Sequence, residues 1–302
     1  MDKQVFHLTS QKQKGIFFVI IGAICFSSKG VLAKLAYRYG VSSLDVLNLR
    51  MLFSLPFYLF IYFRETKRKP IAIKPSIRWD IVLLGLIGYY LAALFDFKGL
   101  EYVSANLERI TIFIYPTFVL LLGFIFYRRK VSLVQLISVL ICYVGIVLAF
   151  YADIDSMDFK KGFIGVVFVL LSALTYAFYL VRSDNIIKNI GTLRFTCLSM
   201  MVSCIAVLIH NFLVNGFNLL SFSMNIYIIC GIIAIGATVL PSFLMTYGIS
   251  LIGSSNMSII ASIGPVSTMF LAYYILGESM TWMHILGTIL VLLGIYILSK
   301  RS

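Results

Sequence analysis

The stretch SANLERITIFIYP, residues 104–116, has a counterpart in SSNMSIIASIGP, residues 254–265. Each begins with a serine, a second small residue and an asparagine, and each ends at a proline inside an apolar run. The two prolines, Pro116 and Pro265, are 149 positions apart. This spacing indicates that the chain contains the same unit twice.

Other residues repeat with a similar spacing. Gly99 and Gly145 match Gly248 and Gly294 at the same offset of 149, and Arg50 matches Arg194 at 144, as small loop insertions would produce. Each unit contains an odd number of apolar runs, so the two units must cross a membrane in opposite orientations. Many transporters use such inverted repeats to form a site near the middle of the bilayer that opens to each side in turn.

Composition places the whole chain in a membrane. Hydrophobic residues make up 61% of it and charged residues only 12%, and the mean hydropathy is +0.99. A soluble domain of this length is not so apolar throughout. The net charge of +13 comes from basic residues in short loops, where the positive-inside rule places them, so nucleic acid is not expected as a partner.

We count ten apolar runs that approach the roughly 20 residues needed to cross a bilayer. The sequence therefore predicts an all-α membrane protein with ten transmembrane helices, arranged as two inverted five-helix repeats over residues 1–155 and 156–302. The expected spans are 15–37, 44–63, 80–100, 104–127, 131–152, 162–182, 193–214, 226–250, 254–276 and 281–299.

Basic residues between the spans predict the orientation. They collect on the side that carries both termini, in the loops at 64–78, 128–130 and 182–188. The opposite side has few, and there Lys160 and Lys161 are offset by Asp153, Asp155 and Asp158. Both termini are therefore expected in the cytoplasm.

The first unit has ionisable residues within its apolar runs, where they are costly and usually functional. At about 1.5 Å per residue, Lys29 lies about 21 Å beyond Gly15, and Asp96 about 24 Å beyond Asp80. The others lie near the outer starts of their helices. All are expected in one cluster in the outer third of the membrane, formed by Lys29, Arg50, Asp96, Glu108 and Arg109.

The second unit does not repeat this cluster. The counterparts of Lys29, Asp96, Glu108 and Arg109 are Tyr176, Met245, Met257 and Ser258, and only Arg50 keeps a charged partner, Arg194. The asymmetry favours a direction-specific role, such as a substrate clamp, a proton site or an outer gate. The alternative is a static ionic network. Repeat symmetry favours a structural or gating role for Arg50 and Arg194.

A central cavity is expected near the paired prolines, because proline breaks a helical hydrogen bond and shapes the helix. Pro116 and Pro265 are assigned this structural role, and the substrate-binding candidates near them are Tyr115, Tyr176, Asn256 and Ser258. Small residues seven positions apart, at Ser138 and Gly145 and again at Gly287 and Gly294, predict close helix packing instead.

No catalytic constellation is visible. The five cysteines lie in apolar runs without metal-ligand spacing, and the three histidines are scattered, so no metal or cofactor is expected. A nucleotide-binding loop is also missing from the sequence. A gradient must therefore drive any transport, with the proton as a candidate coupling ion.

The chain resembles the EamA-type ten-span transporters of the drug/metabolite transporter superfamily. The resemblance is carried by Leu49-Arg50 and Leu193-Arg194, by the two proline stretches, and by the closing run Leu276-Gly277-Glu278-Ser279. The first unit departs from that closing run, with Arg128-Arg129-Lys130 in its place. The resemblance implies export or exchange of small metabolites, such as amino acids or amines, across a bacterial inner membrane.

Two other functions stay open on the sequence. Transport of anionic metabolites or nucleotide-linked sugars is favoured if Lys29 and Arg50 face the cavity. A non-transporting membrane scaffold or a lipid-modifying enzyme is the alternative of another class, although an enzyme would hold reactive groups at the headgroup plane. The expected partners are a small-molecule substrate and the lipid bilayer, and the protein is expected as a monomer or a homodimer.

Overall fold

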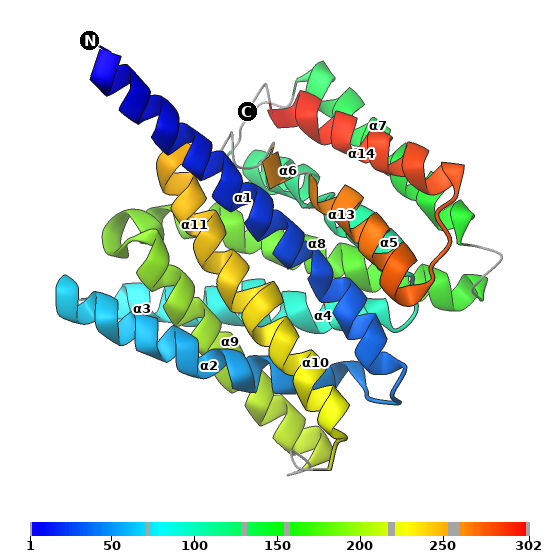
Figure 1. Cartoon of the computed structure of the whole chain (residues 1–302), viewed down its shortest axis with the longest axis horizontal. Helices are drawn as coiled ribbons and strands as arrows, with labels where there is room; N and C mark the ends of the chain where they lie inside the picture. Colours follow the sequence, from blue (N-terminus) through cyan, green and yellow to red (C-terminus); the bar gives the residue numbers. More distant parts are fainter. Residues whose placement is uncertain are drawn as a thin grey trace.

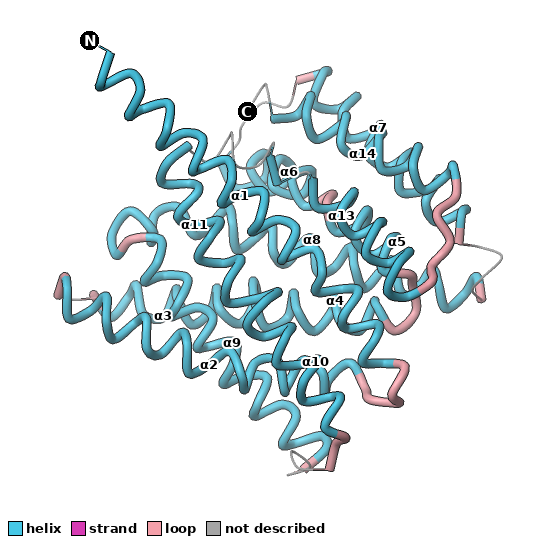
Figure 2. The backbone as a smooth tube through the Cα atoms, viewed as in Figure 1, coloured by secondary structure: helices cyan, strands magenta, loops and turns pink. Residues whose placement is uncertain are grey.

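A computed structural model describes residues 2–70, 73–127, 132–153, 158–216, 221–252, 260–261 and 263–299. These residues form helices joined by short loops, with no strand among them (Figures 1 and 2). The all-α prediction is therefore confirmed for the described part of the chain. Serine hydroxyls begin three of the helices as N-caps, which satisfies backbone N–H groups in the first turn: Ser42, Ser104 and Ser132.

The helices of the first half are α1 (Asp2–Tyr37), α2 (Ser43–Arg68), α3 (Pro75–Gly85), η1 (Leu86–Leu91), α4 (Ala92–Leu100), α5 (Ala105–Ile112), α6 (Tyr115–Tyr127) and α7 (Leu133–Ala152). Those of the second half are α8 (Phe159–Ile190), α9 (Thr192–Asn215), α10 (Met224–Ala234), η2 (Ile235–Val239), α11 (Leu240–Ile252), α13 (Ile263–Leu271), η3 (Ala272–Leu276) and α14 (Trp282–Ser299). Segments marked η are π-helical.

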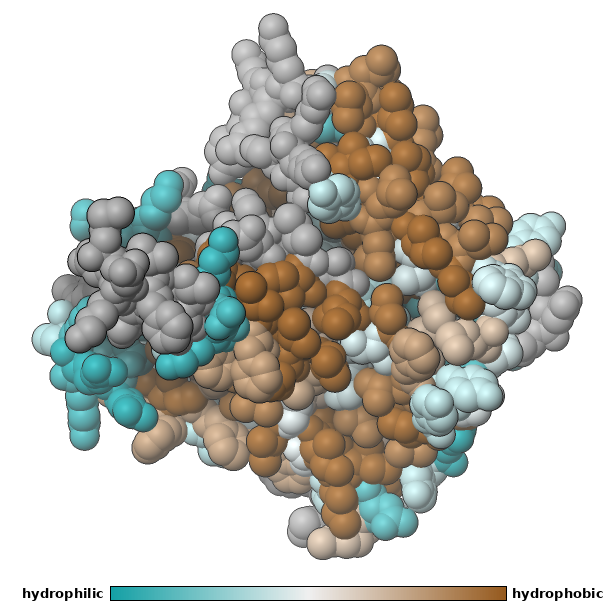
Figure 3. Space-filling view, turned by 45° about the horizontal axis from the view of Figure 1, so that its top comes forward, coloured by the Kyte–Doolittle hydropathy of each residue, from teal (hydrophilic) through white to brown (hydrophobic). Residues whose placement is uncertain are grey.

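Eight helical stretches among the described residues are long and apolar enough to cross a membrane. Two shorter apolar helices, Ile263–Leu276 and Trp282–Ile297, lie where the last two spans are expected. Large hydrophobic side chains are exposed along these helices, and they cover much of the molecular face in Figure 3. The chain is therefore an integral membrane protein.

The two halves pack into each other. Helices α7 and α14 lie side by side (Figure 1), α2 packs against α9, α1 packs against α11, and α4 packs against α8. A Cβ atom added to Gly145 would lie 2.6 Å from the carbonyl oxygen of Gly287, and one added to Gly294 would lie 2.5 Å from Cys142 Sγ. The prediction that small residues allow close helix packing is confirmed at this contact.

A second pair of glycines makes matching contacts in the two halves. A Cβ atom on Gly99 would lie 2.6 Å from Val169 Cγ2, and one on Gly248 would lie 2.4 Å from Val19 Cγ2. Gly99 lies on α4 and faces α8, and Gly248 lies on α11 and faces α1. In each case the third span of one half approaches the first span of the other half. Each glycine leaves room for a valine side chain of the facing helix, so the two helices can approach closely.

The third span of each half, Pro75–Leu100 or Met224–Gly248, contains a π-helical segment. Segment η1 begins at Leu86 and η2 begins at Ile235, which gives 235 − 86 = 149, the offset of the two prolines. A π turn widens an α-helix locally and is frequent at functional sites. The sequence pattern did not predict these segments, because hydrophobic periodicity does not reveal one extra residue in a turn.

The predicted span at 104–127 is two helices, α5 and α6, separated at Phe113 and Ile114. Pro116 is the second residue of α6, where its missing N–H costs no helical hydrogen bond. The proline therefore lies at the start of a new helix.

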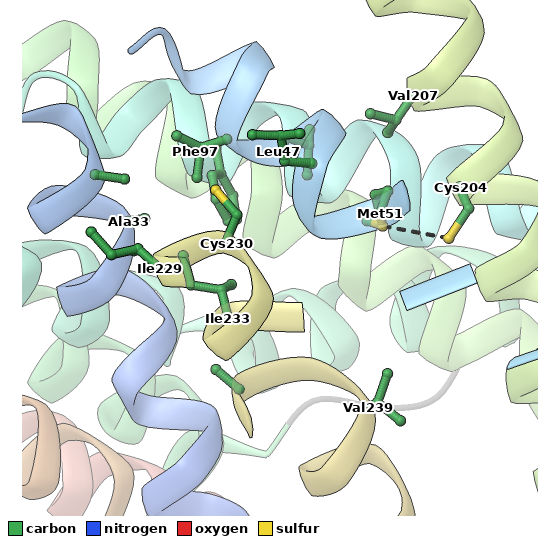
Figure 4. Packing of buried hydrophobic residues seen from close by; sticks show 14 of the residues in the cluster. Ala33, Leu47, Met51, Phe97, Cys204, Val207, Ile229, Cys230, Ile233 and Val239 are labelled. Atoms are coloured by element: carbon green, nitrogen blue, oxygen red, sulfur yellow. Dashed lines mark hydrogen bonds between the residues drawn. The ribbon is translucent and has the colours of Figure 1, made fainter. Parts of the chain in front are cut away.

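The largest hydrophobic cluster joins helices of both halves (Figure 4). Leu47 of α2, Phe97 of α4 and Cys230 of α10 are all fully buried in it. Met51 and Cys204 also meet there, with 3.7 Å between their sulfur atoms. The cysteines of this cluster therefore act as small buried hydrophobic residues.

Candidate functional site

The structure brings Lys29, Asp96, Glu108 and Arg109 together. They come from α1, α4 and α5, and each is at most 6% exposed. Lys29 Nζ donates a hydrogen bond to Asp96 Oδ2 and forms an ion pair with it. A buried charge needs such a partner, because the low dielectric of the interior makes an unpaired charge very costly.

Glu108 adds a second carboxyl group beside this pair. Glu108 Oε1 and Asp96 Oδ1 have no hydrogen-bond partner among the described residues, and two carboxyl groups close together in a low dielectric favour a proton on one of them. Gly30 leaves the room for this arrangement, since a Cβ atom there would lie 2.9 Å from Glu108 Oε2. The cluster therefore has a place for one exchangeable proton.

Arg109 is in none of the ion pairs of the described residues. Its Nε donates to Thr268 Oγ1 of α13 at 3.1 Å, and its guanidinium stands 5.2 Å from the ring centre of Phe26 and 5.8 Å from that of Phe113. Its Nη2 has no hydrogen-bond partner among the described residues. Arg109 therefore links the cluster to the second half of the chain.

Arg50 and Arg194 both bridge the two halves, but to different partners. Arg50 Nε donates to Thr238 Oγ1 in η2 at 2.8 Å. Arg194 donates to the carbonyl groups of Glu65, at 3.1 Å, and Lys69 at the end of α2. A cation near a helix C-terminus satisfies carbonyl groups that lack helical partners.

Tyrosines of α6, α8 and η1 form a separate aromatic group. Tyr115 and Tyr176, both half-buried, meet edge to face with 5.5 Å between ring centres. Tyr176 stacks on Tyr179, and Tyr179 meets Tyr89 of η1. Pro265 is buried and Pro116 is half-buried. The candidates Asn256 and Ser258 lie outside the described residues.

A pocket of about 440 Å³ lies at one end of the helices, next to the charged cluster. Lys34 follows Lys29 by five residues on α1, and Glu101 follows Asp96 by five, so about 7 Å of helix separates the two levels. The pocket is lined by Lys34, Tyr37, Arg38, Glu101, Tyr102, Val103, Ser104, Asp153, Leu276 and Glu278.

Glu278 connects the pocket to the cluster. Its carboxylate accepts the backbone N–H groups of Ala105, at 2.9 Å, and Asn106, at 3.3 Å, in the first turn of α5. Gly277 allows this approach because its φ of +69° is left-handed. Burial raises the pKa of Glu278, and the carboxylate of Asp153 acts in the same direction.

Two further acidic groups of the pocket have partners. Asp153 Oδ1 lies 3.0 Å from Nε2 of the buried His284, and Ser104 donates to Asp153 Oδ2. Burial raises the pKa of Glu101, but hydrogen bonds from the Lys98 side chain and from Ser43 outweigh it and lower the pKa overall. The sequence pattern did not predict this pocket, although the Gly277-Glu278 run was a signal for it.

An all-helical integral membrane protein with a buried ion pair beneath a polar pocket has the features of a transport protein. The chain belongs to the EamA-like transporter family, whose model matches residues 13–151 and again residues 163–300. The protein is therefore a membrane transporter, which acts on a small-molecule substrate in a lipid bilayer.

Relatives agree with this assignment, and a solved structure shares the fold. The "Uncharacterized transporter YcbK" of Bacillus subtilis is 33% identical over 279 residues, covering 90% of this chain and 88% of that protein. The "Uncharacterized inner membrane transporter YicL" of Salmonella typhimurium is 24% identical and covers 96% of each chain. A crystal structure 11% identical in sequence covers 95% of this chain with a TM-score of 0.65, so it shares the fold.

Proposed function

We propose that the protein is a gradient-driven secondary transporter that exports or exchanges small metabolites, such as amino acids or amines, by alternating access. The observation that carries this proposal is the buried Lys29–Asp96 pair with Glu108 beside it. Intramembrane ionisable groups that hold a proton are typical of gradient-coupled transport.

In this proposal the ten spans form two inverted units, residues 1–155 and 156–302, in a bacterial inner membrane with both termini in the cytoplasm. Three observations support the arrangement. The family model matches each half separately, the contacts of Gly99 and Gly248 correspond, and η1 and η2 begin 149 positions apart. In such inverted repeats one unit moves against the other, so that the site opens to each side of the membrane in turn.

The coupling step is assigned to the charged cluster. A proton arriving at Asp96 would remove its charge and release Lys29, and Glu108 beside the pair is a second carboxyl group that can take up the proton. Because α1, α4 and α5 meet there, loss of the ion pair would loosen the outer ends of three helices. The cluster would thus link protonation to opening of the outer side.

The charges of the pocket favour amine-containing substrates over anions. Acidic residues outnumber basic ones among its lining side chains, with Glu101, Asp153 and Glu278 against Lys34 and Arg38. The anionic alternative would place Lys29 and Arg50 in the cavity. Both are buried against partners of the protein itself and neither lines the pocket, so we favour amino acids or amines.

Counterflow in proteoliposomes tests the proposal. We expect at least one amino acid or amine from a metabolite panel to exchange across the membrane, and its accumulation to increase with an imposed pH gradient. No counterflow of any panel compound would contradict transport of this substrate class. Counterflow that ignores every imposed gradient would contradict the coupling.

A further inference from the structure

The connection between α2 and α3 carries a dense group of basic side chains. Residues 64–80 contain six basic residues and two acidic ones, Glu65 and Asp80. The six are all exposed, and we call them the basic edge: Arg64, Lys67, Arg68, Lys69, Lys74 and Arg78. Of these six, only Arg68 belongs to a described ion pair, with Glu65 at 3.8 Å. The basic edge therefore keeps a net positive charge.

The first turn of α9 holds the two parts of the basic edge near each other. Arg194 donates to carbonyl groups at the end of α2, and the next residue, Phe195, is buried in a hydrophobic cluster on which Ile73 and Ile77 pack. Both α2 and α3 pack against α9, and the end of α2, the start of α3 and the start of α9 all lie on the left of Figure 1. Since packed helices lie about 8–10 Å apart, the cations from α2 and α3 flank one helix end.

Exposed aromatic rings lie next to these cations on both helices. On α2, Phe60 and Phe63 are exposed and share one face with Lys67, because the spacings are three and four residues. Lys67 lies about 10 Å further along the helix than Phe60. On α3, the exposed Trp79 follows Arg78 directly, and tryptophan is enriched where a membrane meets water. Each helix thus presents a ring to lipid and a cation at the level of the headgroups.

A ligand that matches this surface must be both anionic and apolar. Like charges that are crowded together repel each other, so the basic edge favours a ligand that brings negative charge. A soluble anion would contact the cations but leave the rings of Phe60 and Phe63 without a partner. A zwitterionic lipid would cover the rings but bring as much positive charge as negative.

We propose that the basic edge binds phospholipids whose headgroup carries a net negative charge, with the phosphate at the level of these cations and the acyl chains beside Phe60 and Phe63. Clusters of about four to eight basic residues next to a transmembrane helix typically attract such lipids. The inference goes beyond the proposed function, since it names a lipid partner and not a transported substrate.

A bound anionic lipid would stabilise a contact between the two halves of the chain. Arg194 belongs to the second half, and the carbonyl groups of Glu65 and Lys69 that it binds end α2 of the first half. The guanidinium of Arg194 is cationic, so the positive charge of the basic edge opposes this contact. An anionic headgroup at the basic edge would reduce the repulsion.

Tryptophan fluorescence of the full-length protein in vesicles tests the site, because the sequence contains two tryptophans. Trp282→Phe leaves only Trp79, and Trp79→Phe leaves only Trp282, which is exposed at the start of α14. Brominated lipids quench a tryptophan that they contact. Trp79 should prefer brominated phosphatidylglycerol over brominated phosphatidylcholine at least about tenfold, because each nearby basic residue contributes about fivefold. Trp282 should show no such preference.

A double variant removes one cation from each side of the connection. Lys67→Gln with Lys74→Gln, placed in the Trp282→Phe protein, should lower the preference of Trp79 for phosphatidylglycerol at least about fivefold. Lys160→Gln with Lys161→Gln is the matched control, because it also removes two exposed lysines, at the start of α8. This control should leave the preference unchanged.

Three results would overturn the lipid site: equal quenching of Trp79 by the two brominated lipids, the same preference at Trp282, or an unchanged preference in the Lys67→Gln, Lys74→Gln variant. Excess inorganic phosphate should not displace the brominated lipid from Trp79, and displacement would assign the basic edge to soluble anions instead. The melting temperature should be higher in phosphatidylglycerol than in phosphatidylcholine vesicles. Equal melting temperatures would contradict the stabilising effect on the contact of Arg194.

Discussion

Arg50 Nε donates a hydrogen bond to Thr238 Oγ1 over 2.8 Å, and the Thr238 hydroxyl donates in turn to the carbonyl of Ile233 at 2.9 Å. The second bond spans five residues, as the hydrogen bonds of a π turn do. Both side chains are buried. A guanidinium of the first half therefore holds the π segment of the second half through one hydroxyl group.

Thr238→Val should destabilise the protein, because it removes that hydroxyl while preserving the shape of the side chain. Arg50 Nε would then be buried without its partner, at a cost of about 1–3 kcal/mol. Thermal unfolding in detergent measures the effect. Thr246→Val is the control, since among the described residues the Thr246 hydroxyl donates to the carbonyl of Ser242 in its own helix. Equal melting temperatures for the two variants would contradict the role of Thr238.

Lys29→Ala and Asp96→Asn should each abolish gradient-driven transport while the protein stays folded in the membrane. Each change leaves one buried charge without its partner, which typically costs about 3–5 kcal/mol. The double variant should be more stable than either single variant, because no unpaired charge is left buried. It should still transport poorly, because the two groups needed for coupling are missing. Counterflow and thermal unfolding on the same preparations give the two readouts.

Arg68→Ala provides a comparison for these variants. Arg68 pairs with Glu65 at 3.8 Å, and its side chain is 70% exposed, so its loss should cost less than about 1 kcal/mol and leave transport unchanged. Normal transport by the Lys29→Ala, Asp96→Asn double variant would show that the pair is only a structural tie.

Cysteine accessibility tests the interior near Tyr115 and Tyr176. In a background without the five native cysteines, Tyr115→Cys and Tyr176→Cys should react with small aqueous thiol reagents in at least one transport state. A protein that keeps only Cys204, which is fully buried, sets the unreactive baseline. Reactivity no higher than that baseline in both states would argue against a cavity there.

Reporter fusions test the proposed orientation. A reporter that is active only in the cytoplasm should be active when fused after Ser302 and inactive when inserted at 153–160. This is expected because basic residues collect on the side of the termini. An extracytoplasmic C-terminus would overturn both the orientation and the inverted-repeat proposal.

Amino-acid binding should weaken as the pH falls. Burial raises the pKa of Glu278 above its ordinary value of 4.5. Its carboxylate is present above that raised pKa and is lost below it, so the ammonium of the ligand loses its partner on the acid side. The charged groups around Glu278 in the pocket are Lys34, Arg38, Glu101 and Asp153. Titration calorimetry across the acid range should show this loss, and Glu278→Gln should largely remove it.

Much of the architecture could be predicted from the sequence. Spans of apolar residues mark the helices because a bilayer imposes a length on them, and the depths of Lys29 and Asp96 along their helices predicted that they lie close together. Arg109 was expected in the same cluster, and there it also donates to Thr268 of α13. Its partner comes from the other half, so distance along the sequence gave no indication of it.

The pocket could not be predicted in the same way. Its walls are ends of helices and turns, where a shift of one or two residues changes which side chains converge. The sequence predicted Asp153 as a loop residue whose charge offsets nearby lysines. Glu278 was part of the closing run of the family, and no role was predicted for it. Their meeting with Lys34 depends on how the two halves pack, which no local pattern specifies.

The pairing of α7 with α14 has a consequence for biosynthesis. The small residues on α7, including Gly145, are covered by α14, which leaves the ribosome after every helix of the first half. Until then this face of α7 must remain against lipid or the insertion machinery, which is tolerable because lipid tails solvate it as well as a helix does. Assembly of the first half is therefore completed only after α14 has been synthesised.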